Sequence, residues 1–234
     1  MKFSLIIPCY NEAANLPLVL ERCKSLASQA GYEVILVDNG STDQSAQVLE
    51  ELLPQYPGCR SIHVTQNQGY GFGILAGLRA SQASILGWTH ADMQTDPVDT
   101  VKGLQLFEEH GDAVFAKGLR YGRPFADTVF TAGMSLFESI LLGTSMRDIN
   151  AQPTMFSRAF FETWRDAPHD FSLDLYAYYK ARKQRLQIHR FPVQFAKRAH
   201  GVSHWNINFA SKRKFIQRTI NYSLTLRRNL RTHQ

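Results

Sequence analysis

Short apolar runs alternate with amphipathic stretches along the first part of the chain. The apolar runs at residues 3–8, 33–37 and 85–88 each predict a strand, and residues 60–65 predict a further one. Between them, apolar residues recur at helical spacing, as at Leu16, Val19 and Leu20. Strands separated by helices of about 10 to 15 residues are typical of an α/β fold, so we expect a mostly parallel central sheet flanked by helices.

The second part of the chain continues less regularly. Residues 114–117 predict a fifth strand followed by a basic loop at 118–124, and residues 125–142 form an amphipathic stretch that ends at Gly143, as a capped helix would. A tyrosine-rich helix that begins within residues 171–176 and a strand at 186–195 follow. We expect one domain over residues 1–205 and a basic amphipathic helical extension over residues 206–234.

Polar side chains follow each predicted strand. Because parallel strands place their carboxyl ends at one edge, the segments 10–12, 38–43, 67–73 and 92–96 should converge on a cleft. Asp92 and Gln94 are two residues apart and could share a magnesium or manganese ion. A solvated turn capped by Asp and Pro is the alternative. The glycines at 69, 71 and 73 fit either a phosphate cradle or tight packing against a neighbour, since the full dinucleotide fingerprint is missing.

The charge of the chain lies mainly near its C-terminus. The net charge is +6 and the pI about 9.3. Arg190 and nine further Lys and Arg residues within 197–231 are accompanied by no acidic residue in that range. Such a balance favours nucleic acid, anionic lipid or phosphorylated partners. Residues 211–231 mix basic and apolar side chains as an interfacial helix does, so we expect contact with a membrane surface; a solvated basic helix is the alternative.

Cysteine usage and hydropathy limit the compartment. The three cysteines are an odd number in no metal-binding spacing, which suits a reducing compartment. The first apolar run is too short for a signal peptide, and no run approaches the roughly 18 apolar residues of a membrane span. We therefore expect a cytoplasmic protein, peripheral on the inner face of the cell membrane.

Three segments together resemble family 2 glycosyltransferases: residues 6–12 (IIPCYNE), 37–43 (VDNGSTD) and 91–94 (ADMQ). Similarity is greatest to the branch of dolichyl-phosphate mannose synthases and bacterial polyprenyl-phosphate sugar transferases, and it runs from residue 3 to about 205. The resemblance implies a Rossmann-like GT-A fold, a nucleotide-sugar donor such as a UDP- or GDP-sugar, Mg²⁺ or Mn²⁺, and inversion at the anomeric carbon. The implied acceptor is a polyprenyl phosphate or another cell-envelope glycan or lipid precursor.

The resemblance also assigns residues to the donor site. Pro8, Tyr10 and Glu12 would line the base and ribose pocket, and Asp38 would accept a hydrogen bond from the base. The full set of donor residues is Pro8, Tyr10, Asn11, Glu12, Asp38, Asn67, Gly69, Ala91, Asp92, Gln94, Arg120 and Arg198. Asp92 and Gln94 would hold the metal ion. The first acid of the family motif is replaced by His90, which is either a neutral imidazole ligand or a structural histidine.

Catalysis would rest on Asp92, Arg120 and Asp174. Arg120, in Gly-Leu-Arg-Tyr, matches an arginine that holds a phosphate through its planar fork, with a solvated loop charge as the alternative. Arg198 begins the segment Arg-Ala-His-Gly-Val-Ser, which resembles a loop that closes over the donor phosphates. Asp174 would be the base for a hydroxyl acceptor, or else a helix-capping or paired charge. A lipid phosphate, which is already anionic, needs no base.

Other functions remain open from the sequence. Lipid-phosphate enzymes of this type carry several arginines where this chain has none, between Pro124 and Met146. A catalytically inactive nucleotide-binding relative is one alternative because of His90. A nucleic-acid-binding protein using the basic C-terminus is another, although no nucleic-acid motif is present and no such partner is expected. A sugar nucleotidyltransferase should carry a glycine- and lysine-rich triphosphate loop, which residues 8–12 do not form.

Overall fold

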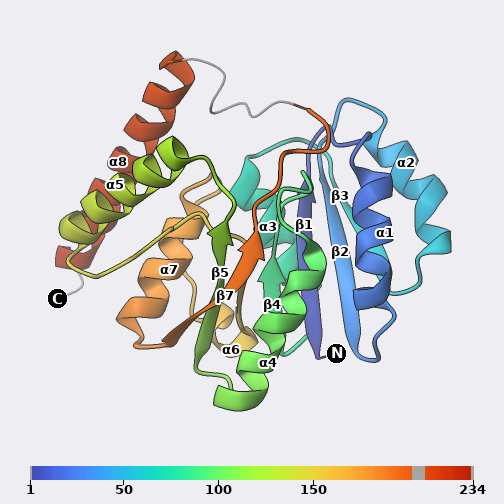
Figure 1. The fold of residues 1–234 in the computed structure, drawn as a ribbon, viewed down its shortest axis with the longest axis horizontal. Helices are drawn as coiled ribbons and strands as arrows, with labels where there is room; N and C mark the ends of the chain where they lie inside the picture. The colour runs from blue at the N-terminus through green and yellow to red at the C-terminus, as the bar shows by residue number, and fades with distance from the viewer. Residues whose placement is uncertain (1, 202–208, 233–234) are drawn as a thin grey trace. The chain divides into compact units, whose positions relative to one another are not determined.

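The computed structural model describes residues 2–201 and 209–232 (Figure 1). These residues form a seven-stranded sheet in the order β3-β2-β1-β4-β6-β5-β7. The strands are β1 (Phe3–Cys9), β2 (Tyr32–Asn39), β3 (Cys59–Val64), β4 (Ile85–Trp88), β5 (Val114–Tyr121), β6 (Thr154–Ser157) and β7 (Gln187–Gln194). All neighbouring pairs are parallel except those of β6, which runs antiparallel to β4 and β5. The predicted α/β fold with a mostly parallel sheet is confirmed.

Helices follow most of the strands, as the alternating pattern predicted. They are α1 (Leu16–Ala27), α2 (Ser45–Leu52), α3 (Tyr70–Ala80), α4 (Thr100–His110), α5 (Phe125–Leu142), α6 (Arg158–Glu162), α7 (Leu173–Lys183) and α8 (Phe209–Thr232). Two short 3₁₀ turns cover Leu53–Gln55 and Pro97–Asp99. The helix expected over residues 125–142 has the predicted bounds and ends in a left-handed Gly143.

Both faces of the sheet are covered by helices. One face of β1 and β2 presents Leu5 and Leu36 to the cluster that also holds Leu20 of α1 and Leu104 of α4. On the other face α3 packs so closely that a Cβ added at Gly77 would lie 2.5 Å from Ile6. Figure 1 shows α1 and α4 together on one side of the sheet. This two-sided burial explains the almost continuous apolar runs of the strands.

The chain divides into two compact units. One comprises residues up to Gly122 together with Asn150–His200 and contains the sheet; the other comprises Arg123–Ile149 with the segment from Gly201 onward. Within the second unit α8 packs against α5. The domain boundary expected between residues 205 and 206 lies outside the described residues and stays a prediction.

Two expectations need correction. The predicted basic loop at 118–124 is wrong in its first half, because β5 pairs with β7 as far as Tyr121 and places Arg120 in a strand. The expectation that nothing approaches the length of a membrane span is also wrong. Among the described residues, α5 is long and apolar enough by length and composition to cross a membrane. Its acidic residues, Asp127 and Glu138, stand near its two ends and interrupt the apolar run only there.

Candidate active site

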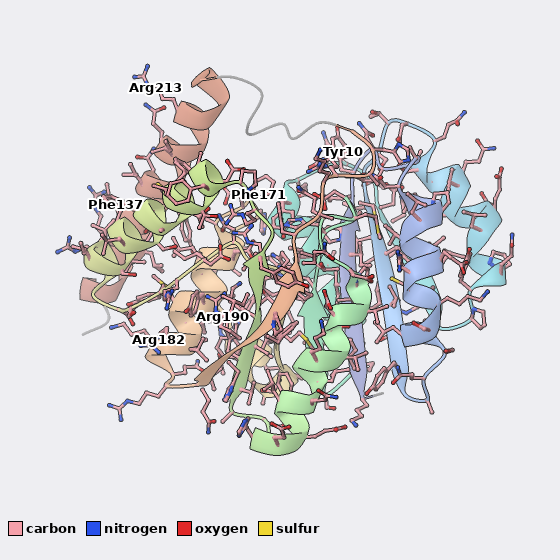
Figure 2. All side chains as sticks on the ribbon, in the orientation of Figure 1. Tyr10, Phe137, Phe171, Arg182, Arg190 and Arg213 are labelled. Carbon is pink, nitrogen blue, oxygen red and sulfur yellow. The ribbon has the colours of Figure 1, made fainter. Side chains whose placement is uncertain are left out.

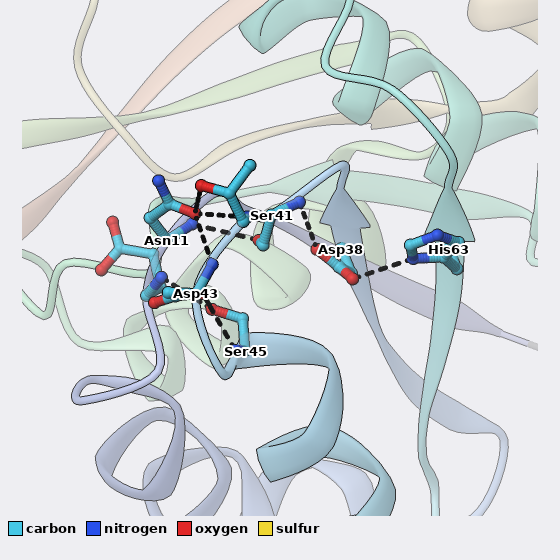
Figure 3. Close-up of polar contacts among 8 residues, drawn as sticks. Asn11, Asp38, Ser41, Asp43, Ser45 and His63 are labelled. Carbon is cyan, nitrogen blue, oxygen red and sulfur yellow. Dashed lines mark hydrogen bonds and ion pairs between the residues drawn. The ribbon is translucent and has the colours of Figure 1, made fainter.

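The loops after β1 and β2 are joined by Asn11 (Figure 3). Asn11 has a left-handed backbone (φ 55°), a conformation that asparagine tolerates better than most residues. Its side-chain oxygen accepts hydrogen bonds from the backbone N–H groups of Thr42 (2.8 Å) and Asp43 (3.3 Å), and its own N–H donates to Ser41 Oγ (3.1 Å). Asn11, predicted to bind the donor, therefore also fixes the shape of the loop pair.

Ser45 is a further link in this network that the sequence analysis did not single out. Its buried hydroxyl donates to Asp43 Oδ1 (2.6 Å) and accepts from the Glu12 N–H (2.9 Å). Burial alone would raise the pKa of Asp43, but hydrogen bonds from Ser45 and from backbone N–H groups, including that of Ala13, together lower that pKa. Helix α2 begins at Ser45, whose N–H donates to Asp43 Oδ1 (2.9 Å), and neither Ser41 nor Thr42 caps the helix. Those residues serve the loop contacts with Asn11 instead.

Asp38 ends β2 and is almost fully buried. Its Oδ1 accepts from the Ser41 N–H at 3.1 Å, and its Oδ2 lies 2.9 Å from Nδ1 of His63 on β3 (Figure 3). Each carboxylate oxygen has a second lone pair, so Asp38 keeps capacity to accept from a ligand. The predicted hydrogen bond to a nucleotide base stays a prediction.

Asp92, Glu12 and Arg198 form the charged centre of the site. The Arg198 guanidinium lies 2.8 Å from Asp92 Oδ2 and 4.0 Å from Glu12 Oε1. The other Asp92 oxygen accepts from the Gln94 N–H at 3.1 Å. Burial raises the pKa of Glu12, against the opposing effects of Asn15 and Arg198. A cation thus lies between two carboxylates delivered by β1 and β4.

The segment after β7 is fastened to the loop that contains Asp92. The N–H of Ala196 donates to the Gln94 carbonyl (2.8 Å), and that of Ala199 donates to the Asp92 carbonyl (3.3 Å). At the start of the segment, the Arg120 guanidinium lies over the ring of Phe195, 5.3 Å from its centroid. Both predicted phosphate-binding arginines therefore contact this segment or belong to it. The last two residues of the predicted closing motif, 202 and 203, lie outside the described residues.

A buried polar cluster surrounds Asp174. Its Oδ1 accepts from Gln152 Nε2 at 2.7 Å and lies 4.0 Å from Nζ of the fully buried Lys117. Gln152 also donates to the Tyr70 hydroxyl at 3.2 Å. Burial raises the pKa of Asp174, although Lys117 and His90 oppose the shift. Lys117 and Gln152 were not predicted as site residues; a lysine ending an apolar strand and a glutamine in a polar turn were the available signals.

His90 lies on the Tyr70 side of the site. Its ring stacks on the Tyr70 ring with centroids 5.4 Å apart, and Tyr70 stacks in turn on Phe171 at 4.5 Å. Within residues 2–201 and 209–232, no group of three or more His, Cys, Asp and Glu side chains is placed to hold a metal ion. The ring stack is the environment expected of the structural alternative for His90.

The glycine segment packs against protein backbone. A Cβ added at Gly69 would lie 2.4 Å from the His169 carbonyl oxygen, and one at Gly71 would lie 2.5 Å from the Pro168 carbonyl oxygen. Asn67 accepts from the Gly69 N–H at 2.8 Å and holds the turn into α3. Of the two interpretations of these glycines, tight packing against a neighbour explains them at Gly69 and Gly71.

The remaining predicted donor residues lie along the same edge of the sheet. Pro8 is in β1 and Ala91 is buried next to Asp92, while Tyr10 is exposed (Figure 2). The structure thus brings the strand-end residues of β1, β2 and β4 to one edge, as expected for parallel strands.

Comparison with known proteins identifies the family. The sequence matches the family model described as "Glycosyl transferase family 2" over residues 4–166, well over half of the chain. The chain belongs to glycosyl transferase family 2. An undecaprenyl-phosphate 4-deoxy-4-formamido-L-arabinose transferase from Photorhabdus laumondii is 37% identical over 119 residues, and the one from Serratia proteamaculans is 39% identical over the same length. Each match covers 48% of this chain, which spans only about a third (36%) of the relative's length.

Solved structures agree on the fold. A glucosyl-3-phosphoglycerate synthase from Mycobacterium tuberculosis, crystallised with Mn²⁺, UDP and glucosyl-3-phosphoglycerate, has a TM-score of 0.73 and 18% identity, covering 97% of this chain and 79% of that one. The same enzyme with Mn²⁺, UDP-glucose and phosphoglyceric acid has a TM-score of 0.71 and 19% identity, covering 95% and 79%. At this identity the likeness shows the fold alone, which is that of GT-A glycosyltransferases. The predicted family, fold and enzyme class are confirmed.

Proposed function

We propose that this glycosyltransferase moves a sugar from a UDP- or GDP-sugar to a polyprenyl phosphate of the cell envelope, with inversion at the anomeric carbon. The observation that carries the proposal is the group formed by Asp92, Arg198 and Glu12 at the carboxyl edge of the sheet. The named function of the curated relatives, transfer to undecaprenyl phosphate, supports the acceptor class.

The donor would lie along the ends of β1, β2 and β4. Asp38 and Tyr10 would contact the nucleoside, and Arg198 and Arg120 would contact the diphosphate. The diphosphate gains negative charge as the bond to the sugar breaks, so fixed guanidinium groups stabilise the transition state more than the ground state. In this arrangement Arg198 would exchange its contact with Asp92 for one with the donor phosphates.

A divalent ion fits the donor set of this edge. Asp92 supplies a carboxylate and Gln94 an amide oxygen, both of which are hard ligands suited to Mg²⁺ or Mn²⁺. Magnesium in phosphate-transfer sites is commonly held by only one or two carboxylates together with substrate phosphates, which suits a site with few acidic ligands. When bound, the ion would neutralise charge on the departing diphosphate. The proposal of a divalent ion is supported by the mycobacterial synthase, which was crystallised with Mn²⁺.

The environment of Asp174 favours a phosphate acceptor. Asp174 is almost fully buried and its carboxylate is held by Gln152 and near Lys117, so it is poorly placed to exchange protons with a hydroxyl acceptor. An acceptor phosphate is already anionic; its oxygen attacks the anomeric carbon while the bond to the diphosphate breaks, and no proton has to move. Asp174 then acts as part of the support for the acceptor side.

Thermal melting with nucleotides tests the donor half of the proposal. UDP, GDP, CDP and ADP are each added with Mg²⁺, Mn²⁺ or chelator, since a ligand that binds only the folded state raises its stability by about 2.7 kcal/mol at 100 times its Kd. We expect a metal-dependent rise with UDP or GDP. Transfer of the matching radiolabelled sugar to undecaprenyl phosphate then tests the acceptor. Absence of a shift with every nucleotide would contradict the donor half of the proposal, whereas a shift without any sugar transfer would favour the inactive nucleotide-binding relative.

A further inference from the structure

Helix α5 buries polar residues and exposes apolar ones. Its buried residues are Ser135, Glu138 and Leu142, two of which are polar. By contrast Phe125 is 83% exposed and Ile140 74%. A helix packed on a protein core places its apolar side inward, so this helix is oriented for an apolar phase outside the chain.

The exposed apolar residues form a continuous stripe. Phe125, Val129, Leu136 and Ile140 are exposed and separated by steps of four and seven, which places them on one line along the helix. The stripe extends over about 22 Å at 1.5 Å per residue. No Asp, Glu, Lys or Arg occurs within residues 128–137. Single exposed apolar residues are ordinary on protein surfaces, whereas contiguous stripes mark interaction sites.

The opposite side of α5 is fixed to a basic helix. Ser223 of α8 donates a hydrogen bond to the buried Glu138 carboxylate, and both helices belong to the same compact unit. Arg213, Arg227 and Arg228 of α8 are exposed (Arg213 is labelled in Figure 2). The α5–α8 pair therefore combines an apolar stripe with exposed cations, the combination that binds anionic bilayers.

We infer that α5 lies flat in the headgroup region of an anionic membrane, with its stripe toward the acyl chains and α8 facing lipid phosphates. Spanning the bilayer would carry Glu138 into the hydrocarbon and break its contact with Ser223, which disfavours a transmembrane position. A second copy docked on the stripe would leave the exposed arginines of α8 without a partner surface, whereas an anionic membrane engages both the stripe and these cations. The inference rests on the proposed function for its purpose, since an enzyme that takes a lipid phosphate must work at a bilayer.

Vesicle flotation of the full chain tests this inference. Vesicles of phosphatidylglycerol and phosphatidylethanolamine are compared with vesicles of phosphatidylcholine alone. We expect wild type to float with the anionic vesicles, and Leu136→Glu and Ile140→Glu each to weaken the partition about tenfold or more, because each removes an exposed apolar side chain that the membrane would bury. Leu18→Glu is the matched control: Leu18 is an exposed leucine of α1, in the other unit, and its replacement should leave flotation unchanged.

A double variant of α8 tests the role of its exposed arginines separately. Arg227→Glu with Arg228→Glu should weaken binding to anionic vesicles at least about tenfold, since each cation near such a surface is worth roughly fivefold in affinity. On phosphatidylcholine vesicles, the same double variant should behave like wild type. Equal losses on both vesicle types would overturn the assignment of α8 to lipid phosphates.

Three results would overturn the inference. One is wild type that does not bind anionic vesicles, and another is Leu136→Glu that binds them as wild type does. The third is a lipid-free dimer that Leu136→Glu dissociates, which would assign the stripe to a second copy. Nucleotide-induced melting shifts are measured on the same variants. Retained shifts with lost flotation support the inference, and wild-type flotation without any nucleotide response would contradict the proposed function alone.

Discussion

Replacement of Arg198 by alanine tests the charged centre most directly. The substitution removes a guanidinium that lies 2.8 Å from Asp92 and 4.0 Å from Glu12, and it leaves the two carboxylates without their shared cation. Both effects should appear in the unliganded protein, before any question of activity. The experiment therefore examines the geometry of the site independently of the proposed substrate.

The size of the effect follows from distance and exposure. Hydrogen bonds to charged groups contribute about 1.5–3 kcal/mol, whereas exposed ion pairs contribute only about 0–1 kcal/mol. The Arg198 side chain is 25% exposed and that of Asp92 7%, which places this pair between the two cases. We expect Arg198→Ala to lower the free energy of unfolding by about 1–2 kcal/mol. For a chain of this length the melting temperature should fall by about 2–8 °C.

The assay is calorimetric melting with and without Mn²⁺, in the absence of nucleotide. Because Arg198 and a divalent ion would compete for Asp92, Mn²⁺ should raise the melting temperature of Arg198→Ala more than that of wild type. Arg22→Ala is the control. Arg22 lies 3.5 Å from Asp96 in an exposed ion pair, and its loss should change stability by less than about 0.5 kcal/mol.

Two outcomes would refute the reasoning about Arg198. If Arg198→Ala melts at the wild-type temperature, the ion pair with Asp92 does not stabilise the resting protein. If Mn²⁺ raises the melting temperature of both proteins equally, Arg198 and the metal ion do not share a site. With an active preparation, the variant should also lose about 100-fold or more in kcat, since a fixed charge facing the leaving group is removed.

Three further predictions concern the surroundings of the site. Ser45→Ala removes both hydrogen bonds of a buried hydroxyl and should lower the free energy of unfolding, measured with denaturant, by about 1–3 kcal/mol. The control Ser28→Ala, at an exposed serine, should change it by less than about 0.5 kcal/mol. Equal effects of the two substitutions would contradict the role of the loop network. Gly71→Ala would place a Cβ 2.5 Å from a backbone carbonyl oxygen and should lower the free energy of unfolding by about 1–3 kcal/mol. Gly133→Ala, whose Cβ would meet nothing within 4 Å, should stabilise the protein slightly. A Gly71→Ala variant as stable as wild type would refute the packing argument. Burial raises the pKa of Asp174 above the ordinary 3.8, so the folded protein holds this proton more tightly than the unfolded chain does. Wild type should therefore lose stability as the pH rises from about 4 through the folded pKa, and Asp174→Asn should not show this loss. Parallel stability profiles of the two proteins against pH would refute the prediction.

The repeating part of the fold was predictable because its signals are local. Three of the first four strands, β1, β2 and β4, are short apolar runs, and β4 has the predicted bounds, Ile85–Trp88. The place of β6 was not predictable, because a four-residue strand takes its position from partners far away in the sequence. The length of β5 was not predictable for the same reason, because pairing with the distant strand β7 extends β5 past Lys117 to Tyr121.

In the candidate site too, local features were predictable and contacts between distant segments were not. Residues at strand ends, such as Asp38 and Asp92, could be proposed from motif and position alone, since parallel strands share one edge. The partner of Asp92 is 106 positions away in the sequence, and only the folded chain shows that Arg198 reaches it. The support of Asp174 by Gln152 and Lys117 likewise needs three separate segments to meet. Their role assignments stay predictions, although their positions are known.

Helix α5 shows what periodicity leaves undetermined. The spacing of apolar residues predicted a helix over residues 125–142 and its end at Gly143, and both are confirmed. The same spacing cannot tell which phase the apolar stripe meets, because a stripe turned toward a protein core and one turned toward lipid have identical periods. The side was decided by Glu138, whose hydrogen bond with Ser223 holds the polar face inward. Glu138→Gln, which keeps an acceptor for that hydroxyl, should therefore preserve vesicle binding, whereas Leu136→Glu should weaken it about tenfold or more.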